Sequence, residues 1–291
     1  MREDILHDNS EMLARYADIL TNRPAFASKA DLAELASALL MPPEEAAAYL
    51  LCEALGLDAA EPRGRRLFEK YVRPSLTLKH PSAYLDDPFA RLLRRAREEH
   101  PAPSGRVVLT DACLPAMTLF PAGDIRVFPD GRAVQPVAFF TEDFSYPSLR
   151  DGGREWMSLH PNEIETILPK ARAARGRVLC LGLGMGYYLY HAAANPRVES
   201  ITAVERDPEI ISRFTLTLLP LFPKEKIRLV KGDAFAFLPA PGEYDTVFAD
   251  LWHDVSDGLP LWRRLKALEV PDTRYQYWLG ETLACYDRGW V

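Results

Sequence analysis

The first hundred residues carry apolar side chains at spacings of three and four, which is typical of helices that bury one face. Five segments show this pattern: Ser10–Leu20, Lys29–Leu40, Glu44–Leu55, Arg65–Val72 and Pro88–Glu99. Ser28 and Asp31 are spaced as a capping box before the second of them, and Pro42 and Pro43 suit the first turn of the third. We therefore predict a small helical bundle over residues 1–100.

The pattern changes after residue 100. The segment Pro101–Gly105 is rich in Pro, Ser and Gly, which indicates a linker. Short β-prone runs separated by turn signals follow at Val107–Leu109, Ile125–Phe128 and Val137–Phe140. We predict a small antiparallel β element within residues 101–154, and we expect residues 141–155 to form a loop.

From residue 155 to the end, apolar β-type runs alternate with segments of helical spacing. A helix at Pro161–Ala174 precedes four expected strands, which are Val178–Leu183, Ile201–Glu205, Ile227–Lys231 and Asp245–Asp250. Helices are expected between them at Tyr187–Ala194, Pro208–Leu219 and Ala234–Leu238. This alternation predicts an α/β fold in which residues 155–291 form a Rossmann-like, doubly wound parallel sheet.

Two further helices, Leu259–Leu268 and Arg274–Tyr286, are expected after the fourth strand, and no further strand is evident. The sheet is therefore predicted to be truncated after that strand. An exposed sheet edge invites unwanted pairing, so we expect the C-terminal helices or a second subunit, as in a homodimer, to cover it.

Composition narrows the class of protein. The 291 residues are 48% hydrophobic and 26% charged, which suits a globular chain and excludes a disordered or collagen-like one. Against 41 Asp and Glu stand 35 Lys and Arg, so the chain lacks the basic excess with which proteins hold a nucleic-acid backbone. Arg91, Arg94 and Arg95 share one helical face and leave a local phosphate contact open.

Cysteine usage and hydropathy bear on the compartment. The four cysteines are far apart and lie largely in apolar runs, which predicts reduced core thiols: Cys52, Cys113, Cys180 and Cys285. No stretch approaches the roughly 18 apolar residues of a membrane span, and the first residues lack a signal-peptide pattern. We expect a cytoplasmic protein without membrane contact.

The strand Val178–Leu183 leads directly into three alternating glycines, Gly182, Gly184 and Gly186. Glycines at a strand-to-helix turn let the backbone approach a nucleotide-like ligand, and the new helix presents free N–H groups. The spacing differs from the G-x-G-x-x-G of nicotinamide and flavin sites because the third glycine comes one residue early. The turn therefore predicts a cofactor site of another kind.

Acidic residues end or follow the next three strands. Glu205 ends the second strand, where an acid can hold ribose hydroxyls, and Asp233 follows the third, where it can accept from an adenine amine beside the N–H of Ala234. Asp250 ends the fourth strand. Helix capping is the alternative role for Asp233, and a helix-initiating surface acid is the alternative for Glu205. Ligands of open α/β sheets lie beyond the carboxyl ends of the strands, so one crevice should hold all three acids.

These elements resemble, in order and spacing, the class I S-adenosylmethionine-dependent methyltransferases, and within them the spermidine synthase-like branch. The resemblance covers residues 155–260 and is carried by four motifs: Gly182–Gly186, Val204–Pro208, Gly232–Ala234 and Tyr244–Asp250. It implies S-adenosylmethionine as the cofactor.

The resemblance also implies roles for individual residues. The three glycines would pass close to the methionyl part of the cofactor, and Glu205 would hold the ribose. Asp233 and Ala234 would bind adenine, and Asp250 would face the reacting centre. Met185 and Arg206, which stand inside the first two motifs, are added to the expected cofactor contacts.

The sequence departs from the aminopropyl-transferring relatives at two positions. Those relatives carry an acid in the glycine turn and a D-x-x-D run after the fourth strand, whereas this chain has Met185 and His253 there. Because a diammonium substrate needs paired carboxylates, transfer of a methyl group to an unidentified small-molecule or macromolecular acceptor is the leading hypothesis. Aminopropyl transfer from decarboxylated S-adenosylmethionine and a non-catalytic cofactor-binding scaffold are the alternatives.

Further candidates surround this edge. Asp250 or His253 could remove a proton from the acceptor, and Trp252 could line the pocket or pack against the next helix. Tyr146, Glu155 and Trp156 precede the sheet and could exclude water from the sulfonium, or could simply anchor loops. No metal site is expected, because the histidines lack Cys or acidic partners at ligand spacing.

Overall fold

The computed structural model describes residues 3–99 and 107–290 and divides into two compact units. Unit 1 comprises residues 1–83, 113–145 and 284–291, and unit 2 comprises residues 84–112 and 146–283. This division, which follows the contacts between residues, differs from the predicted domain boundaries at 100/101 and 154/155. The predicted linker Pro101–Gly105 lies outside the described residues.

Unit 1 contains four of the five predicted N-terminal helices. They are α1 (Glu3–Asn22), α2 (Lys29–Ala38), α3 (Pro43–Ala54) and α4 (Pro62–Leu67), the last continued by a π-helical turn at Phe68–Val72. The capping box before α2 is present, because the N–H of Asp31 donates to Ser28 Oγ and the N–H of Ser28 donates to the Asp31 carboxylate. A short helix α5 (Ser82–Leu85) follows at the boundary of the unit.

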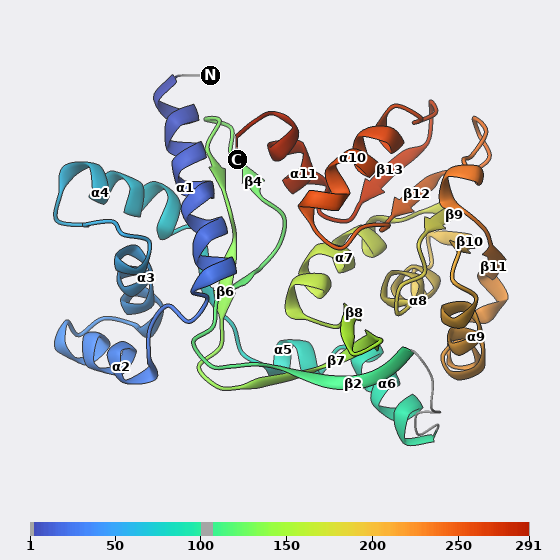
Figure 1. Cartoon of the computed structure of the whole chain (residues 1–291), viewed down its shortest axis with the longest axis horizontal. Coiled ribbons are helices and arrows are strands. Elements are labelled where there is room, and N and C mark those ends of the chain that lie inside the picture. The colour runs from blue at the N-terminus through green and yellow to red at the C-terminus, as the bar shows by residue number, and fades with distance from the viewer. Residues whose placement is uncertain (1–2, 100–106, 291) are drawn as a thin grey trace. The chain divides into compact units, whose positions relative to one another are not determined.

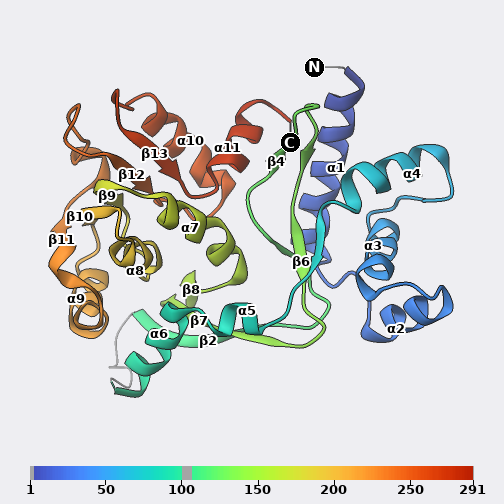
Figure 2. The same cartoon turned by 180° about the vertical axis from the view of Figure 1, so that it is seen from behind.

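Unit 1 is not all-helical, because strands from two distant segments pair inside it. The short strand β1 (Leu76–Leu78) pairs in parallel with β6 (Val137–Phe139), and β6 pairs antiparallel with β3 (Phe120–Pro121). A second antiparallel pair joins β4 (Arg126–Val127) to β5 (Ala133–Val134), and α1 runs beside this hairpin (Figure 2). The bundle predicted for residues 1–100 therefore shares its core with residues 113–145.

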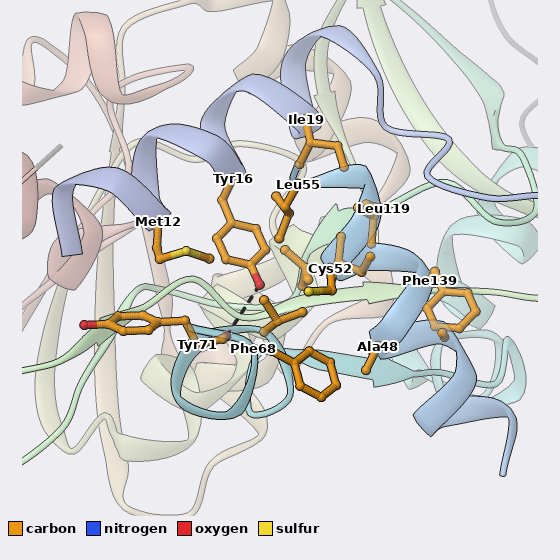
Figure 3. Close-up of a cluster of buried hydrophobic side chains, with 14 of the residues drawn as sticks. Met12, Tyr16, Ile19, Ala48, Cys52, Leu55, Phe68, Tyr71, Leu119 and Phe139 are labelled. Carbon is orange, nitrogen blue, oxygen red and sulfur yellow. Dashed lines mark hydrogen bonds between the residues drawn. The ribbon is translucent and has the colours of Figure 1, made fainter. Parts of the chain in front are cut away.

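That core is drawn in Figure 3. Met12, Tyr16 and Ile19 of α1 pack with residues of α3, with Phe68 and Tyr71, and with Leu119 and Phe139 from the later segment. The Tyr16 hydroxyl donates to the backbone carbonyl of Tyr71, so the polar atom of this buried ring is satisfied. Cys52 and Cys285 are also buried in unit 1, whereas Cys113 is exposed.

Unit 2 begins with helix α6 (Pro88–Glu99), whose bounds match the prediction. Strand β2 (Val107–Leu114), which crosses the boundary between the units, is ordered with β7 (Phe144–Asp151) and β8 (Arg154–Ser158) in one sheet. The prediction of a loop at residues 141–155 was wrong. Asp151 pairs with Arg154 across a two-residue turn, Gly152 and Gly153, a dipeptide that favours a tight β-hairpin.

The remainder of unit 2 is the predicted Rossmann-like α/β fold. Helix α7 (Pro161–Ala173) precedes a parallel sheet whose strands lie in the order β11-β10-β9-β12-β13. The first four in sequence are β9 (Gly176–Leu181), β10 (Val198–Glu205), β11 (Ile227–Lys231) and β12 (Thr246–Ala249). Helices α8 (Tyr187–Ala194) and α9 (Pro208–Thr217) lie on one side of the sheet and α10 (Val255–Lys266) on the other (Figure 1).

The sheet is not truncated after its fourth strand. Residues Arg274–Tyr277, predicted as the start of a helix, form the strand β13, which pairs in parallel with β12. The final helix, α11, is the shorter segment Gly280–Asp287. Likewise, the helix predicted at Ala234–Leu238 is only a 3₁₀ turn at Ala234–Ala236. The edge of β12 is therefore covered by β13 of the same chain.

No helix within residues 3–99 or 107–290 is long and apolar enough to span a membrane.

Candidate functional site

The carboxyl ends of four neighbouring strands lie level with one another in unit 2. Leu181 of β9 is paired with Val204 of β10 and with Ala249 of β12, and Val204 is paired with Val230 of β11. The next residue of each strand continues the ladder, since the N–H of Gly182 donates to Val204 O and that of Asp250 donates to Leu181 O. The glycine turn, Glu205, the Gly232–Ala234 segment and Asp250 therefore leave the sheet at one edge.

The three glycines of the turn have different surroundings. A Cβ on Gly182 would lie 2.1 Å from the carbonyl oxygen of Asp250, and one on Gly186 would lie 2.5 Å from the Phe214 ring. At these two positions the lack of space for a Cβ is by itself enough to require glycine. A Cβ on Gly184, with φ of +59°, would meet only the Met157 sulfur at 3.4 Å and the Gly186 nitrogen at 4.0 Å. Gly184 is the member of the turn whose backbone is open to a ligand.

Glu205 is tied to the glycine turn. Its Oε2 accepts the N–H of Leu183 at 3.1 Å, and its Oε1 accepts the N–H groups of Arg206 and Asp207 at 2.8 and 2.9 Å. The carboxylate is therefore held at the end of β10 by three backbone donors, and Oε2, which accepts only one of them, retains a further lone pair. The helix-initiating role that was the alternative for Glu205 belongs instead to Asp207, which accepts the N–H groups of Glu209 and Ile210 at the start of α9.

Asp233 does cap the turn that follows it, because its Oδ1 accepts the N–H of Phe235 at 2.8 Å. Capping leaves the other carboxylate oxygen available, and Asp233 is exposed. A Cβ on the neighbouring Gly232 would meet only Val204 Cγ1, at 3.9 Å. The guanidinium of Arg264 on α10 lies 3.8 Å from the centre of the Phe235 ring, which places a cation–π contact beside this segment.

Asp250 stands in an acidic group of side chains. Burial raises the pKa of Asp250 to about 7, and its carboxylate has no hydrogen-bond partner among the described residues. The pKa of Glu163, in the first turn of α7, is also well above its usual value, because of burial and then because of the charges of Asp250 and Glu155. Glu155 in turn accepts the Ser148 hydroxyl at 2.6 Å.

Sequence reasoning missed Glu163. Its position, three residues after His160 in a helix-start segment, indicated only a first-turn acid that complements the helix dipole. Ionisable groups whose pKa is shifted by burial and by like charges gather at functional sites, and this is the property that distinguishes Glu163. Glu163 is thus a further carboxylate beside Asp250. The sequence motifs, in which Met185 and His253 stand where aminopropyl-transferring relatives have acids, did not reveal it.

His253 is exposed on the loop before α10 and is held by Asp257. Its Nδ1 lies 3.1 Å from Asp257 Oδ2, and the same carboxylate accepts the backbone N–H groups of His253 and Asp254. Asp254 caps α10 in a box with Asp257. Trp156 presents its ring to His253 at 4.9 Å between centroids, nearly perpendicular, so the structure brings together two residues that were predicted separately as site candidates.

Two candidate pocket residues are packed inside unit 2. Trp252 is buried, stacks on Tyr277 of β13 at 6.4 Å between centroids and covers Gly258 of α10, so the packing role considered for it is the observed one. Tyr146 is buried and presents its ring edge-on to His160 at 5.1 Å. Burial lowers the pKa of His160 to about 4, and its Nδ1 accepts the N–H of Asn162 at the start of α7.

The remaining candidates differ in exposure. Met185, which belongs to the glycine turn, is buried, whereas Arg206 is exposed. Ala234 is buried beside Asp233. Among the described residues, no three His, Cys, Asp or Glu side chains are grouped closely enough to hold a metal ion.

The residues at this edge suit an adenosyl cofactor. Gly184 and Gly232 leave space where a Cβ would otherwise stand, and Glu205 is fixed by backbone donors with a lone pair free on Oε2. Acids with lone pairs available at the ends of adjacent strands are the groups that hold ribose and adenine in folds of this kind.

No protein-family model matches the chain, and no curated protein does. Solved structures with a partial likeness include a precorrin-8w decarboxylase from Methanobacterium thermoautotrophicum, 23% identical, covering 35% of this chain and 53% of that chain, TM-score 0.28. The mitomycin 7-O-methyltransferase MmcR is 21% identical over 39% of this chain and 36% of its own, TM-score 0.30. The Trypanosoma brucei PRMT1 enzyme-prozyme complex with AdoHcy is 18% identical over 38% and 35%, TM-score 0.30.

Methyltransferases are thus among the solved structures that resemble part of this chain, which spans about half of one of the three proteins and about a third of the other two.

Proposed function

We propose that this chain is an S-adenosylmethionine-dependent methyltransferase that binds its cofactor at the carboxyl edge of the β11-β10-β9-β12-β13 sheet. The supporting observation is the level alignment of four strand ends that carry the glycine turn, Glu205, Asp233 and Asp250. In this proposal Gly184 approaches the methionyl part, Glu205 binds the ribose hydroxyls, and Asp233 with the N–H of Ala234 binds adenine. The predicted cytoplasmic location stays a prediction.

The cofactor supplies a methyl group on a good leaving group, so the protein chiefly aligns and desolvates the acceptor. Asp250 is suited to take a proton from the acceptor, since a carboxyl whose pKa lies near 7 can act as a base at neutral pH. His253 is the second candidate base. Its contact with Asp257 fixes the imidazole, and a hydrogen bond at Nδ1 leaves Nε2 as the free nitrogen.

Calorimetric titration tests the proposal directly. Wild-type protein should bind S-adenosylmethionine and S-adenosylhomocysteine, and Gly184→Val should abolish binding because a branched side chain at φ of +59° is strained and fills the open position. Gly242→Val is the matched control, since Gly242 has φ of +74° and open space around it but precedes β12 at its amino end. Failure of the wild type to bind either compound refutes the proposal.

Aminopropyl transfer is a second candidate because Glu163 and Glu155 accompany Asp250. Paired carboxylates are what a diammonium substrate needs, and Glu163 offers one that the glycine turn lacks. The two reactions are distinguished by comparing cofactors in the same titration. Tighter binding of decarboxylated S-adenosylmethionine than of S-adenosylmethionine would favour aminopropyl transfer.

A further inference from the structure

Asp87 is a buried carboxylate at the start of α6, and the four polar groups around it come from two helices. Its Oδ1 accepts the backbone N–H groups of Phe89 and Ala90, at 2.8 and 3.2 Å. Its Oδ2 accepts the Tyr187 hydroxyl at 2.9 Å and lies 3.5 Å from His191 Nε2. Asp87 is 7% exposed and Tyr187 is 5% exposed, so water competes little for these contacts.

The burial of this charge needs an explanation, because an ionised carboxylate in a protein interior is costly unless it is paired and hydrogen-bonded. Burial alone would raise the pKa of Asp87, but the neighbouring His191 and Tyr187 lower it below its usual value. The carboxylate is therefore ionised, and its bond to the Tyr187 hydroxyl is of the stronger, charge-assisted kind.

Tyr187 is the first residue of α8 and directly follows Gly186 of the glycine turn. Aromatic rings complete its surroundings. Phe89, two residues after Asp87, packs edge-on against Tyr187 at 5.5 Å between centroids, while Phe214 stands against Gly186. Tyr187, the residue that follows the turn, is thus held by one charged hydrogen bond to Asp87 and one ring contact with Phe89, and nothing in the motifs of the turn predicts this.

We infer that Asp87 is a positioning residue for the cofactor-binding turn: through Tyr187 it fixes where α8 begins and so where Gly184 is presented. This inference rests on the proposed function only in the identity of the ligand. Asp87 lies 100 residues before Tyr187 and accepts the hydroxyl of that residue, which directly follows the turn, so its effect is on alignment and not on chemistry.

The test compares Tyr187→Phe with Tyr84→Phe in the full chain. Each substitution removes one buried tyrosine hydroxyl that donates to a carboxylate in unit 2, at 2.9 Å to Asp87 and at 2.8 Å to Glu165. Tyr84 belongs to α5 and its partner to α7, so the control removes a hydroxyl that bonds to neither Asp87 nor Tyr187. Asp87→Asn, which keeps an acceptor oxygen, and Asp87→Ala complete the series.

Three measurements are made on each variant: melting temperature, amide hydrogen exchange of residues 182–190 without ligand, and the dissociation constant for S-adenosylhomocysteine. We expect the two tyrosine variants to lose similar thermal stability. Tyr187→Phe and Asp87→Ala should also exchange faster at the turn and bind roughly tenfold more weakly, as loss of a charge-assisted hydrogen bond implies. Asp87→Asn should fall between Asp87→Ala and wild type.

Equal exchange and equal affinity in Tyr187→Phe and Tyr84→Phe would overturn the inference and leave Asp87 a structural residue. If Asp87→Ala does not fold, the Tyr187→Phe comparison decides alone. If wild-type protein fails to bind S-adenosylhomocysteine, the proposed function fails, yet the exchange measurement still shows whether Asp87 holds the turn.

Discussion

At the scale of single residues, the sheet edge is more acidic than its motifs indicate. Asp250 and Glu163 both have pKa values raised by burial, and Glu163 is raised further by its acidic neighbours. Such groups favour the protonated form in the folded protein. They therefore lower stability as they ionise, which a residue retained only for packing would not do.

This gives a pH dependence with a definite sign. The pKa of Asp250 is about 7 when folded, against an ordinary value of 3.8, so the folded state binds more protons between these limits. The free energy of unfolding should therefore fall as pH rises from about 4 to about 7, by about 2–4 kcal/mol for this group. Asp250→Asn should flatten the dependence in urea unfolding measured across that range, with Glu163 retaining part of it.

Asp245→Asn serves as the control, because hydrogen bonds from Arg177 lower the pKa of Asp245 at the opposite end of β12. Its contribution should be lost as pH falls, the reverse of the Asp250 effect. An unchanged slope in Asp250→Asn would show that its folded pKa is ordinary.

At the scale of elements, the sequence predicted a helix or strand correctly where the local pattern of apolar, polar and turn residues is enough to determine it. The glycine turn, α8 and β11 have their predicted positions because apolar runs and turn residues agree there. Strand β13 was not predicted because one of its buried residues, Gln276, is polar. The residue is satisfied by the Tyr188 hydroxyl and by Lys170 O, partners that only the folded chain brings near.

The acidic site was similarly only half predictable. Asp250 and Glu155 could be selected from motifs or from their place before the sheet, but the local sequence around Glu163 resembles any helix start. Its proximity to Asp250 depends on how α7 packs beside the sheet. Spacing along the chain carries no information about that packing.

Helix α10 offers a test of whether the cost of overpacking outweighs the gain in helix propensity when a glycine is replaced by alanine. Replacing glycine by alanine inside a helix normally stabilises by about 1 kcal/mol. At Gly258, however, a Cβ would lie 2.8 Å from two atoms of the Trp252 ring, and overpacking costs about 1–3 kcal/mol. We therefore expect Gly258→Ala to lower the melting temperature. In a Trp252→Leu background, where the ring is absent, the same change should be neutral or stabilising, and a persistent loss there would contradict the packing explanation.

At the scale of the whole molecule, both units are assembled from separated segments. The core of unit 1 joins Met12, Tyr16 and Ile19 to Leu119 and Phe139, and its strand β1 pairs with β6. Helical spacing in residues 1–100 correctly indicated helices, but it could not show that their apolar faces are completed by a segment beyond residue 112.

A fragment of residues 1–100 should therefore fail to fold cooperatively, since it lacks the strand partner of β1 and a wall of its core. A chain that joins residues 1–83 to 113–145 through a flexible linker should recover a cooperative thermal transition followed by circular dichroism. A sharp transition in the 1–100 fragment alone would contradict the assignment of residues 113–145 to this core.

The polypeptide passes between the two units four times, after residues 83, 112, 145 and 283. No single protease cleavage can consequently yield two fragments that each carry one intact unit. A chain nicked once should keep its pieces together through native contacts and co-migrate as one species under native conditions, separating only in denaturant.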